Sequence, residues 1–171
     1  MTSAGTPDAL AAAAVAALRS RGWTLATAES LTAGLLAATV AGVPGASDVL
    51  RGGLIVYATD LKRDLADVPA DVLAREGAVS AATARALAVG AARRCGADVG
   101  IGLTGVAGPD RQEGRPVGTV HVGVCAPGVD PWAIRVSLPG DRGAVRRGAV
   151  ATALDLLAGR IVDGRGNESA S

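Results

Sequence analysis

The spacing of apolar and polar positions divides the chain into alternating helices and strands. Residues 7–19 predict a helix, which Thr6 can cap, which Pro7 suits in its first turn, and which Gly22 can end. Apolar runs bounded by glycine and proline predict the remaining elements. The predicted strands are residues 23–28, 53–58, 99–104, 117–125 and 132–138, and the further predicted helices are residues 33–41, 60–66, 69–75 and 81–94 and a last one from Gly140 or Asp141 to about residue 158.

The order of these elements predicts the fold class. Strands alternate with helices over the first two thirds of the chain, which favours a sheet with helices on its faces. A turn around Pro127 to Pro131 joins the last two strands and favours an antiparallel hairpin. We therefore predict an α/β fold, a three-layer α/β/α sandwich around a mixed sheet. We expect one domain over residues 1–162, because no internal repeat or long linker interrupts the pattern, and a polar, mobile tail over residues 163–171.

Composition and charge exclude several classes of protein. The chain has 171 residues, of which 49% are hydrophobic and 19% are charged, and its net charge is +1. These values suit a folded domain and differ from those of a disordered chain or a dedicated nucleic-acid binder. The longest uncharged stretch, residues 30–47, is rich in Ala, Gly and Thr and contains Pro44, so it does not suit a membrane-spanning helix of about 20 apolar residues. We expect a cytoplasmic protein that binds neither membranes nor nucleic acids.

Cysteine and histidine are too few for a disulfide framework or a Cys/His zinc site. Cys95 and Cys125 are the two cysteines, and His121 is the single histidine. We expect reduced thiols, whereas the residues alone leave carboxylate-bound Mg²⁺ open. Lys62 is the single lysine in a chain that otherwise uses Arg. A desolvated Lys can lose its proton and act as a base, which Arg cannot; the alternative is an exposed lysine on a short polar helix.

Ser30 is the candidate nucleophile, because it lies between a predicted strand and a predicted helix. Backbone N–H groups at a helix start can bind an oxyanion, although a serine in this position can equally be a helix cap. If Ser30 is a nucleophile, Lys62 suits the role of base better than His121, whose place inside a strand favours a packed or surface residue. Glu29 can orient such a site or pair with an arginine.

Two loops carry residue types that bind anions. Gly105 and Gly108 follow the predicted strand 99–104, and backbone N–H groups beside them can cradle an anion at the strand end. Arg142 lies at the start of the last helix, where the helix dipole also favours a phosphate. The alternatives are a structural turn for the glycines, and a helix cap at Asp141 beside a surface arginine.

Several strings, in order along the chain, resemble the C-terminal domain of the CinA family of competence/damage-inducible proteins, whose stand-alone members include nicotinamide-nucleotide amidohydrolases. The strings are TAESLTAG (27–34), RGGLIVY (51–57) with Lys62 five residues on, GAVS (77–80), LTGVAGP (103–109), PVGT (116–119) and PGDR (139–142). Leu31 and Ala33 stand where the family's usual AESCTGG motif has its cysteine and its first glycine. Ala33 adds a methyl group where backbone and substrate can approach closely, and the loop 109–116 is more charged than usual.

The resemblance implies hydrolysis of the carboxamide of nicotinamide mononucleotide to nicotinic acid mononucleotide and ammonia, by a homodimer that needs no metal and no cofactor. It implies that Ser30 attacks the amide, that Lys62 is the base, directly or through Tyr57, and that Thr104 helps to hold the oxyanion. The implied substrate-binding residues are Glu29, Thr32, Gly34, Gly105, Gly108 and, for the phosphate, Arg142. The alternative functions are a non-catalytic binding or interaction module and an amidase for another small amide.

Overall fold

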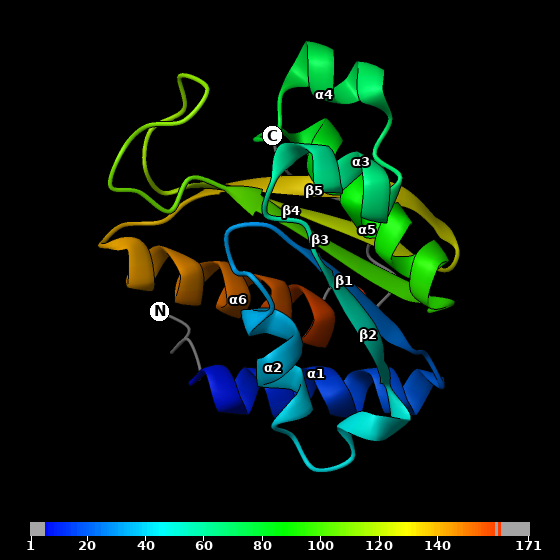
Figure 1. The fold of residues 1–171 in the computed structure, drawn as a ribbon. Coiled ribbons are helices and arrows are strands. Elements are labelled where there is room, and N and C mark those ends of the chain that lie inside the picture. The colour runs from blue at the N-terminus through cyan, green and yellow to red at the C-terminus, as the bar shows by residue number, and fades with distance from the viewer. Residues whose placement is uncertain (1–5, 160, 162–171) are drawn as a thin grey trace.

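Five strands and six α-helices make up the part of the chain that the computed structural model describes, residues 6–159 and 161 (Figure 1). The strands are β1 (Leu25–Glu29), β2 (Leu50–Ile55), β3 (Val99–Gly105), β4 (Thr119–Ala126) and β5 (Val129–Ser137). The helices are α1 (Pro7–Arg21), α2 (Leu35–Ala41), α3 (Thr59–Ala66), α4 (Ala70–Glu76), α5 (Ala81–Cys95) and α6 (Arg142–Ala158), with a short 3₁₀ turn, η1 (Ala46–Asp48), before β2.

The strands form one mixed sheet in the order β2-β1-β3-β4-β5. β1 pairs in parallel with β2 and β3, whereas β3, β4 and β5 pair antiparallel. Helices α1, α2 and α6 lie on one side of the sheet, and α3, α4 and α5 lie on the other (Figure 1). The structure therefore confirms the predicted α/β/α sandwich with a mixed sheet.

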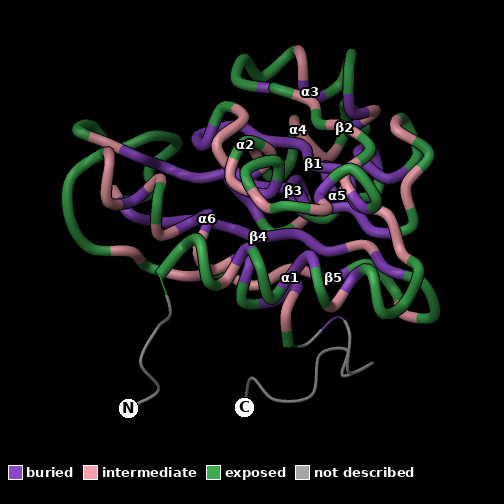
Figure 2. Tube along the Cα trace, turned by 90° about the horizontal axis from the view of Figure 1, so that it is seen from below, coloured by how far each residue is buried: buried purple, intermediate pink, exposed green. Residues whose placement is uncertain are grey.

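Apolar side chains fill the space on both sides of the sheet. The larger cluster packs α1, α2 and α6 against the strands and includes Leu36 and Leu157. The smaller cluster lies between β1, α3 and α5 and includes Leu87. Figure 2 shows the buried residues running along the strands. Lys62 and Glu29 are also fully buried, which is rare for charged residues and marks the region between these clusters as a candidate site.

Glycines in the sheet set the position of α5. A Cβ atom at Gly100 or Gly102 of β3, or at Gly123 of β4, would overlap backbone atoms of α5. The helix therefore lies closer to the sheet than side chains on those strands would allow. This close approach fixes the start of α5, and with it the preceding turn at residues 77–80.

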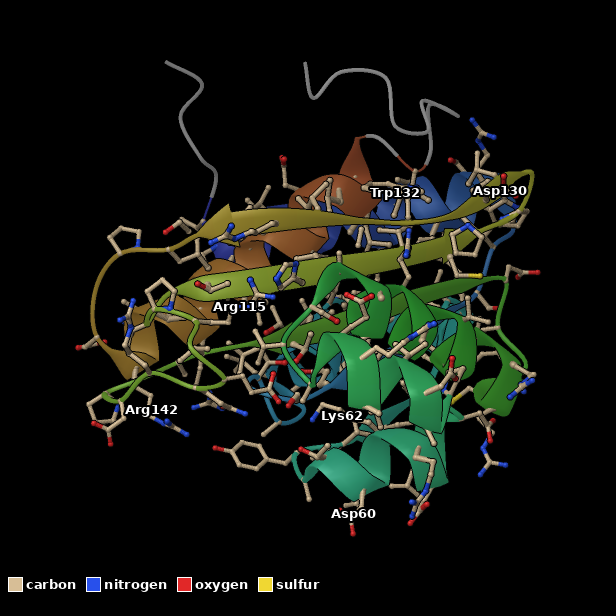
Figure 3. The ribbon with its side chains drawn as sticks, turned by 90° about the horizontal axis from the view of Figure 1, so that it is seen from above. Asp60, Lys62, Arg115, Asp130, Trp132 and Arg142 are labelled. Atoms are coloured by element: carbon tan, nitrogen blue, oxygen red, sulfur yellow. The ribbon has the colours of Figure 1, made fainter. Side chains whose placement is uncertain are left out.

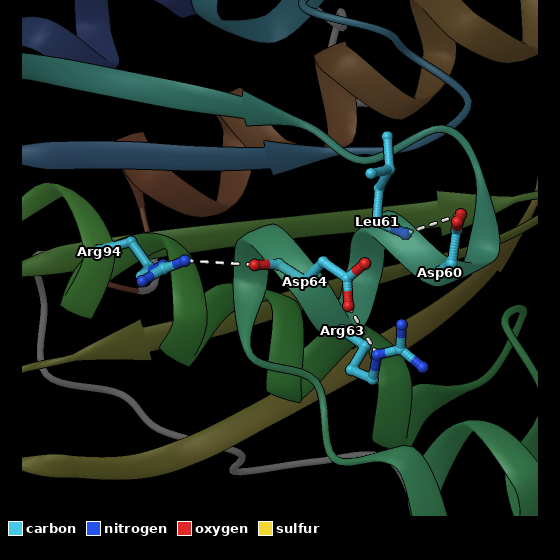
Figure 4. A network of polar contacts seen from close by, with 5 residues as sticks. All are labelled: Asp60, Leu61, Arg63, Asp64 and Arg94. Carbon is cyan, nitrogen blue, oxygen red and sulfur yellow. Dashed lines mark hydrogen bonds and ion pairs between the residues drawn. The ribbon is translucent and has the colours of Figure 1, made fainter.

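Helix α3 is held against α5, which places Lys62. Gly90 of α5 leaves room for the carbonyl of Ala66 at the end of α3, where a Cβ would overlap that carbonyl. Arg94 of α5 donates from Nη2 to the carbonyl of Asp64 in α3 at 3.2 Å (Figure 4). Close packing and a hydrogen bond, both from α5, thus fix the end of the helix that carries the only lysine.

β2 begins and ends three residues earlier than the sequence predicts. β2 spans Leu50–Ile55 rather than 53–58, because its parallel pairing with β1 begins at Leu25 and Leu50. The N–H of Val56 still donates to the backbone carbonyl of Glu29 at 2.9 Å, but the chain then leaves the sheet, and Tyr57 is 55% exposed. The apolar run at residues 53–58 therefore forms the end of a strand and the start of a loop.

The hairpin turn is shorter than predicted. It consists of Pro127 and Gly128, whereas Pro131 lies inside β5. β5 is an edge strand, where the missing N–H of a proline is tolerated. The last predicted segment, the tail at residues 163–171, lies outside the described residues.

Candidate active site

Ser30 and Lys62 meet at the end of β1. Ser30 follows β1 directly, and its N–H donates to the carbonyl of Leu103 in β3 at 2.9 Å, so the sheet fixes its backbone. Lys62 of α3 is 2% exposed, and its Nζ donates to Ser30 Oγ at 3.0 Å. Figure 3 shows where Lys62 and Arg142 lie in the fold. The structure thus brings together the two side chains that the sequence suggested as nucleophile and base.

The surroundings of Lys62 prepare its amine to act as a base. Nζ also donates to the carbonyls of Val56 at 2.9 Å and Tyr57 at 3.3 Å. Burial lowers the pKa of Lys62, and the negative charge of Glu113 opposes this effect. When the amine is neutral, its two N–H bonds can remain on the carbonyls while its lone pair accepts the Ser30 proton.

The side chain of Tyr57 does not connect Lys62 to Ser30. Lys62 contacts only the backbone carbonyl of Tyr57, whereas the phenol oxygen accepts a hydrogen bond from Arg142 Nη2 at 2.7 Å. Of the two proton routes left open by the sequence, the structure therefore offers the direct one. Tyr57 instead contributes its exposed ring to the wall of the cavity described below.

Glu29 caps α2 and is not part of the wall of the cavity beside Ser30 that is described below, so its substrate-binding role stays a prediction. It is 1% exposed, and its carboxylate accepts four hydrogen bonds at 2.9–3.1 Å, from the hydroxyl of Thr27 and the N–H groups of Gly34, Leu36 and Ala37. These N–H groups begin α2 and would otherwise lack partners. The helix start next to Ser30 is therefore already occupied by an anion, so it does not offer the oxyanion site suggested by the sequence.

Thr32 and Gly34 shape the turn that carries Ser30, and neither lines the cavity beside Ser30. The turn includes Ala33 at φ 49° and Gly34 at φ 95°. A left-handed conformation costs a non-glycine residue about 1–2 kcal/mol, so the turn is strained at Ala33. Thr32 is fully buried, and its hydroxyl has no partner among the described residues. The structure shows a role for Thr32 and Gly34 in the backbone of the turn, and their implied substrate contacts stay predictions.

Thr104 fixes a neighbouring turn. It is 1% exposed, and its hydroxyl donates to the carbonyl of Ala78 at 2.6 Å. This hydroxyl donates to a carbonyl outside the cavity wall, to which Thr104 does not belong, and its expected oxyanion role stays a prediction. The bond instead holds the turn before α5 against β3.

A cavity of about 400 Å³ opens beside Ser30. Its wall consists of Ser30, Leu31, Tyr57, Gly105, Val106, Ala107, Gly108, Pro109, Asp110, Arg111, Gln112 and Arg142. The end of β3 and the loop after it supply most of this wall, as expected for a ligand site at strand ends. The predicted residues Gly105, Gly108 and Arg142 all belong to it.

The charged side chains of the cavity wall favour an anionic ligand. Arg111 and Arg142 outnumber the single carboxylate, Asp110. Arg142 Nη1 donates to the carbonyl of Gly108 at 2.6 Å, which ties the start of α6 to the loop. Asp141 caps α6 by accepting the N–H of Ala144 at 2.8 Å. The predicted cap at Asp141 is present, Arg142 lines the cavity beside it, and phosphate binding by Arg142 stays a prediction.

His121 lies outside the cavity wall, inside β4, as the sequence suggested. It is 6% exposed, and neither ring nitrogen has a partner among the described residues. Burial lowers the pKa of His121, and the charges of Arg135 and Arg115 add to this effect. Within residues 6–159 and 161, no cluster of His, Cys, Asp or Glu could hold a metal ion. None of the described helices is both long and apolar enough to cross a bilayer.

Two residues near the site, Glu113 and Arg146, are not predicted from the sequence. Glu113 accepts the N–H groups of Ala78 and Val79, both at 3.0 Å, which anchors the loop that forms the cavity wall. Arg146 donates to backbone carbonyls in the turn that carries Ser30. The unusual charge of the loop 109–116 is the sequence signal that could have indicated Glu113. For Arg146 the signal is its position four residues after Arg142, which places both on one helix face.

Comparison with known sequences finds relatives along nearly the whole described chain. The family model of the CinA C-terminal domain matches residues 7–161. A CinA-like protein from Frankia casuarinae is 49% identical over 154 residues, covering 90% of this chain and 35% of that protein. A protein described as competence-damage inducible, from Geobacillus kaustophilus, is 46% identical over 129 residues, covering 75% and 31%. The chain thus spans about a third of the length of these relatives.

Solved structures share the fold. A CinA superfamily protein from Klebsiella pneumoniae 700603 superposes with a TM-score of 0.89 and 32% identity, covering 93% of this chain and 99% of that one. A CinA superfamily protein from Escherichia coli gives a TM-score of 0.86 and 32% identity, covering 90% of each chain.

Proposed function

Because the chain belongs to the CinA C-terminal domain family, we propose that its cavity hydrolyses the carboxamide of nicotinamide mononucleotide, giving nicotinic acid mononucleotide and ammonia. The observation that carries the proposal is the 3.0 Å contact between Lys62 Nζ and Ser30 Oγ at the edge of the cavity. A serine paired with a buried amine is an arrangement that can break an amide bond by nucleophilic catalysis.

In the first half of the reaction, Ser30 Oγ bonds to the carboxamide carbon while neutral Lys62 takes its proton. The carbonyl oxygen becomes an oxyanion, for which the N–H of Leu31, the residue after Ser30, is the candidate donor in place of the Thr104 hydroxyl. The tetrahedral intermediate then collapses. Its C–N bond breaks, and Lys62 gives its proton to the leaving nitrogen, which departs as ammonia.

In the second half, water hydrolyses the nicotinoyl ester on Ser30. Lys62, neutral again, takes a proton from the water as its oxygen bonds to the ester carbon. The bond from carbon to Ser30 Oγ breaks, and Lys62 returns the proton to Oγ. The same amine therefore serves both halves, and the product carboxylate leaves beside the cationic wall of the cavity.

The cationic side of the cavity suits the phosphate of the substrate. Arg142 lies at the start of α6 and Arg111 in the loop opposite, so both can approach a phosphate from within the cavity wall. The exposed ring of Tyr57 offers a flat apolar face for the pyridinium ring. These contacts would place the carboxamide, at the other end of the substrate, near Ser30.

Ammonia release from nicotinamide mononucleotide by the purified chain tests this proposal, with Ser30→Ala as the negative control. Hydrolysis by the wild type and none by the variant supports it. Saturable binding of the mononucleotide without ammonia release would instead make the chain a binding module. Faster release from amides that lack the phosphate would point to a different amide substrate.

A further inference from the structure

Arg146 of α6 donates hydrogen bonds to the turn that carries Ser30. It lies in α6, four residues after Arg142, and is half-buried. Its Nε donates to the carbonyl of Leu31 at 2.9 Å, and its Nη2 donates to the carbonyl of Thr32 at 3.0 Å. Two donors on one planar guanidinium fix the orientation of a partner as well as its distance. These two carbonyls belong to the residues directly after the nucleophile.

Opposite charges hold this turn from two directions. The Glu29 carboxylate accepts the N–H of Gly34, at the end of the turn, while Arg146 donates to carbonyls at its beginning. Ala33 lies between them with φ at 49°. A non-glycine residue persists in such a conformation only when its surroundings enforce it. The side chain of Arg146 is not among those that line the described cavity, so its contacts serve the turn and not a ligand.

We propose that Arg146 is a positioning residue, which holds the strained turn in the form that brings Ser30 Oγ to Lys62. The inference rests on the proposed function in one respect, that Ser30 is the nucleophile. In this proposal α6 contributes two residues from one face. Arg142 binds the ligand, and Arg146 holds the backbone that positions Ser30.

Arg146→Met tests the inference, because methionine fills similar space without donating hydrogen bonds. A displaced nucleophile costs about 10²-fold in rate, so kcat should fall by about that factor while KM stays nearly constant. Arg146→Lys should recover only part of the loss, since one ammonium group cannot serve both carbonyls in the same planar geometry. Arg147→Met is the matched control, because Arg147 is the next residue, is exposed, and contacts neither carbonyl.

Ala33→Gly separates positioning from a general effect on folding. Glycine adopts a positive φ without steric cost, so the turn needs less support when residue 33 is glycine. The double variant Arg146→Met/Ala33→Gly should therefore regain about tenfold in kcat over Arg146→Met alone. A merely structural role for Arg146 predicts no such rescue.

A serine-directed fluorophosphonate gives a readout that does not depend on the natural substrate. Ser30 Oγ bonds to phosphorus, the P–F bond breaks to release fluoride, and Lys62 takes the serine proton. The labelling rate should fall in Arg146→Met and recover in the double variant. Unchanged labelling and kcat in Arg146→Met, or in Arg146→Lys if the former does not fold, would overturn the inference. Wild-type labelling with this pattern but without ammonia release would reject the proposed substrate and keep the inference.

Discussion

Lys62 Nζ lies 3.0 Å from Ser30 Oγ, although 32 residues separate the two in the chain. Ser30 follows the C-terminal end of β1. The parallel strand β2 ends beside it, so α3, which follows β2, begins at the same end of the sheet. Because the carbonyls of Val56 and Tyr57 hold the amine in place, loss of one proton reverses the hydrogen bond, so that Ser30 donates to Lys62. The protonation state of one side chain therefore decides whether the serine is activated.

The pKa of Lys62 can be measured without interference from other lysines. Protein labelled with ¹³C-lysine should give one lysine signal, because the chain contains one lysine. The titration of this signal should show a pKa below the ordinary lysine value, since burial disfavours the charged amine. In Glu113→Gln the pKa should fall further, because the opposing negative charge is lost.

Activity should follow the same titration. The neutral amine is the active form, so kcat/KM should rise with pH through the pKa of Lys62, and this limb should move to lower pH in Glu113→Gln. Glu76→Gln is the matched control: the same charge is removed from an exposed residue at the end of α4. An ordinary pKa in the wild type, or equal shifts in both variants, would contradict the assigned role of Glu113 and Lys62.

Glu29→Gln distinguishes a helix cap from a substrate ligand. Glutamine keeps the shape of the side chain but removes the charge and one acceptor oxygen, so α2 loses part of its cap. Helix caps contribute about 1 kcal/mol, and we expect the free energy of unfolding to fall by that amount or more. Denaturant unfolding measures the loss, and KM for the mononucleotide should stay close to that of the wild type. A large rise in KM with unchanged stability would instead support the substrate-binding role.

His121→Leu should stabilise the fold. The substitution removes two buried ring nitrogens without partners among the described residues, and an unsatisfied buried polar group costs about 1–3 kcal/mol. The pKa of His121 is lowered in the folded state, so the unfolded chain binds a proton first as the pH falls below about 6.5. The wild type should therefore lose stability from that pH down to the lowered pKa, and His121→Leu should lose less. Parallel pH curves of unfolding free energy would show that His121 does not titrate in this way.

Arg142→Met should weaken the binding of a phosphorylated substrate. Arg142 lines the cavity, and loss of one charge-assisted contact to phosphate corresponds to about tenfold in KM or more. Nicotinamide riboside, which lacks the phosphate, is the matched comparison, and its kcat/KM should change little. An equal loss for both substrates would assign Arg142 to the cavity shape through its bonds to Gly108 and Tyr57.

The fold could be predicted from the sequence because its signals are local. Apolar runs and a helix cap such as Thr6 predict the elements, and Thr6 caps α1 in the structure. Pairing partners are not local, which explains the shifted bounds of β2. The sequence predicts a turn that includes Pro131, because it does not show that β5 is an edge strand, where a proline is tolerated.

The candidate site could be predicted only in part. The motif order indicated Ser30 and Lys62, but the partners of a buried polar side chain depend on the packed structure. Glu29 and Thr104 therefore had residue types that suit catalysis, while their hydrogen bonds go to α2 and to Ala78. Arg146 acts on backbone carbonyls 114 and 115 residues away, a contact that no local pattern contains.

In the proposed hydrolysis of nicotinamide mononucleotide, Ser30 attacks the carboxamide and Lys62 carries the proton. The most direct measurement is the rate of ammonia release by the wild type, Ser30→Ala and Lys62→Arg under the same conditions. Arginine retains the positive charge but does not deprotonate, so both variants should lose at least about 10²-fold in rate. A Lys62→Arg protein as fast as the wild type would contradict the role of Lys62 as the base.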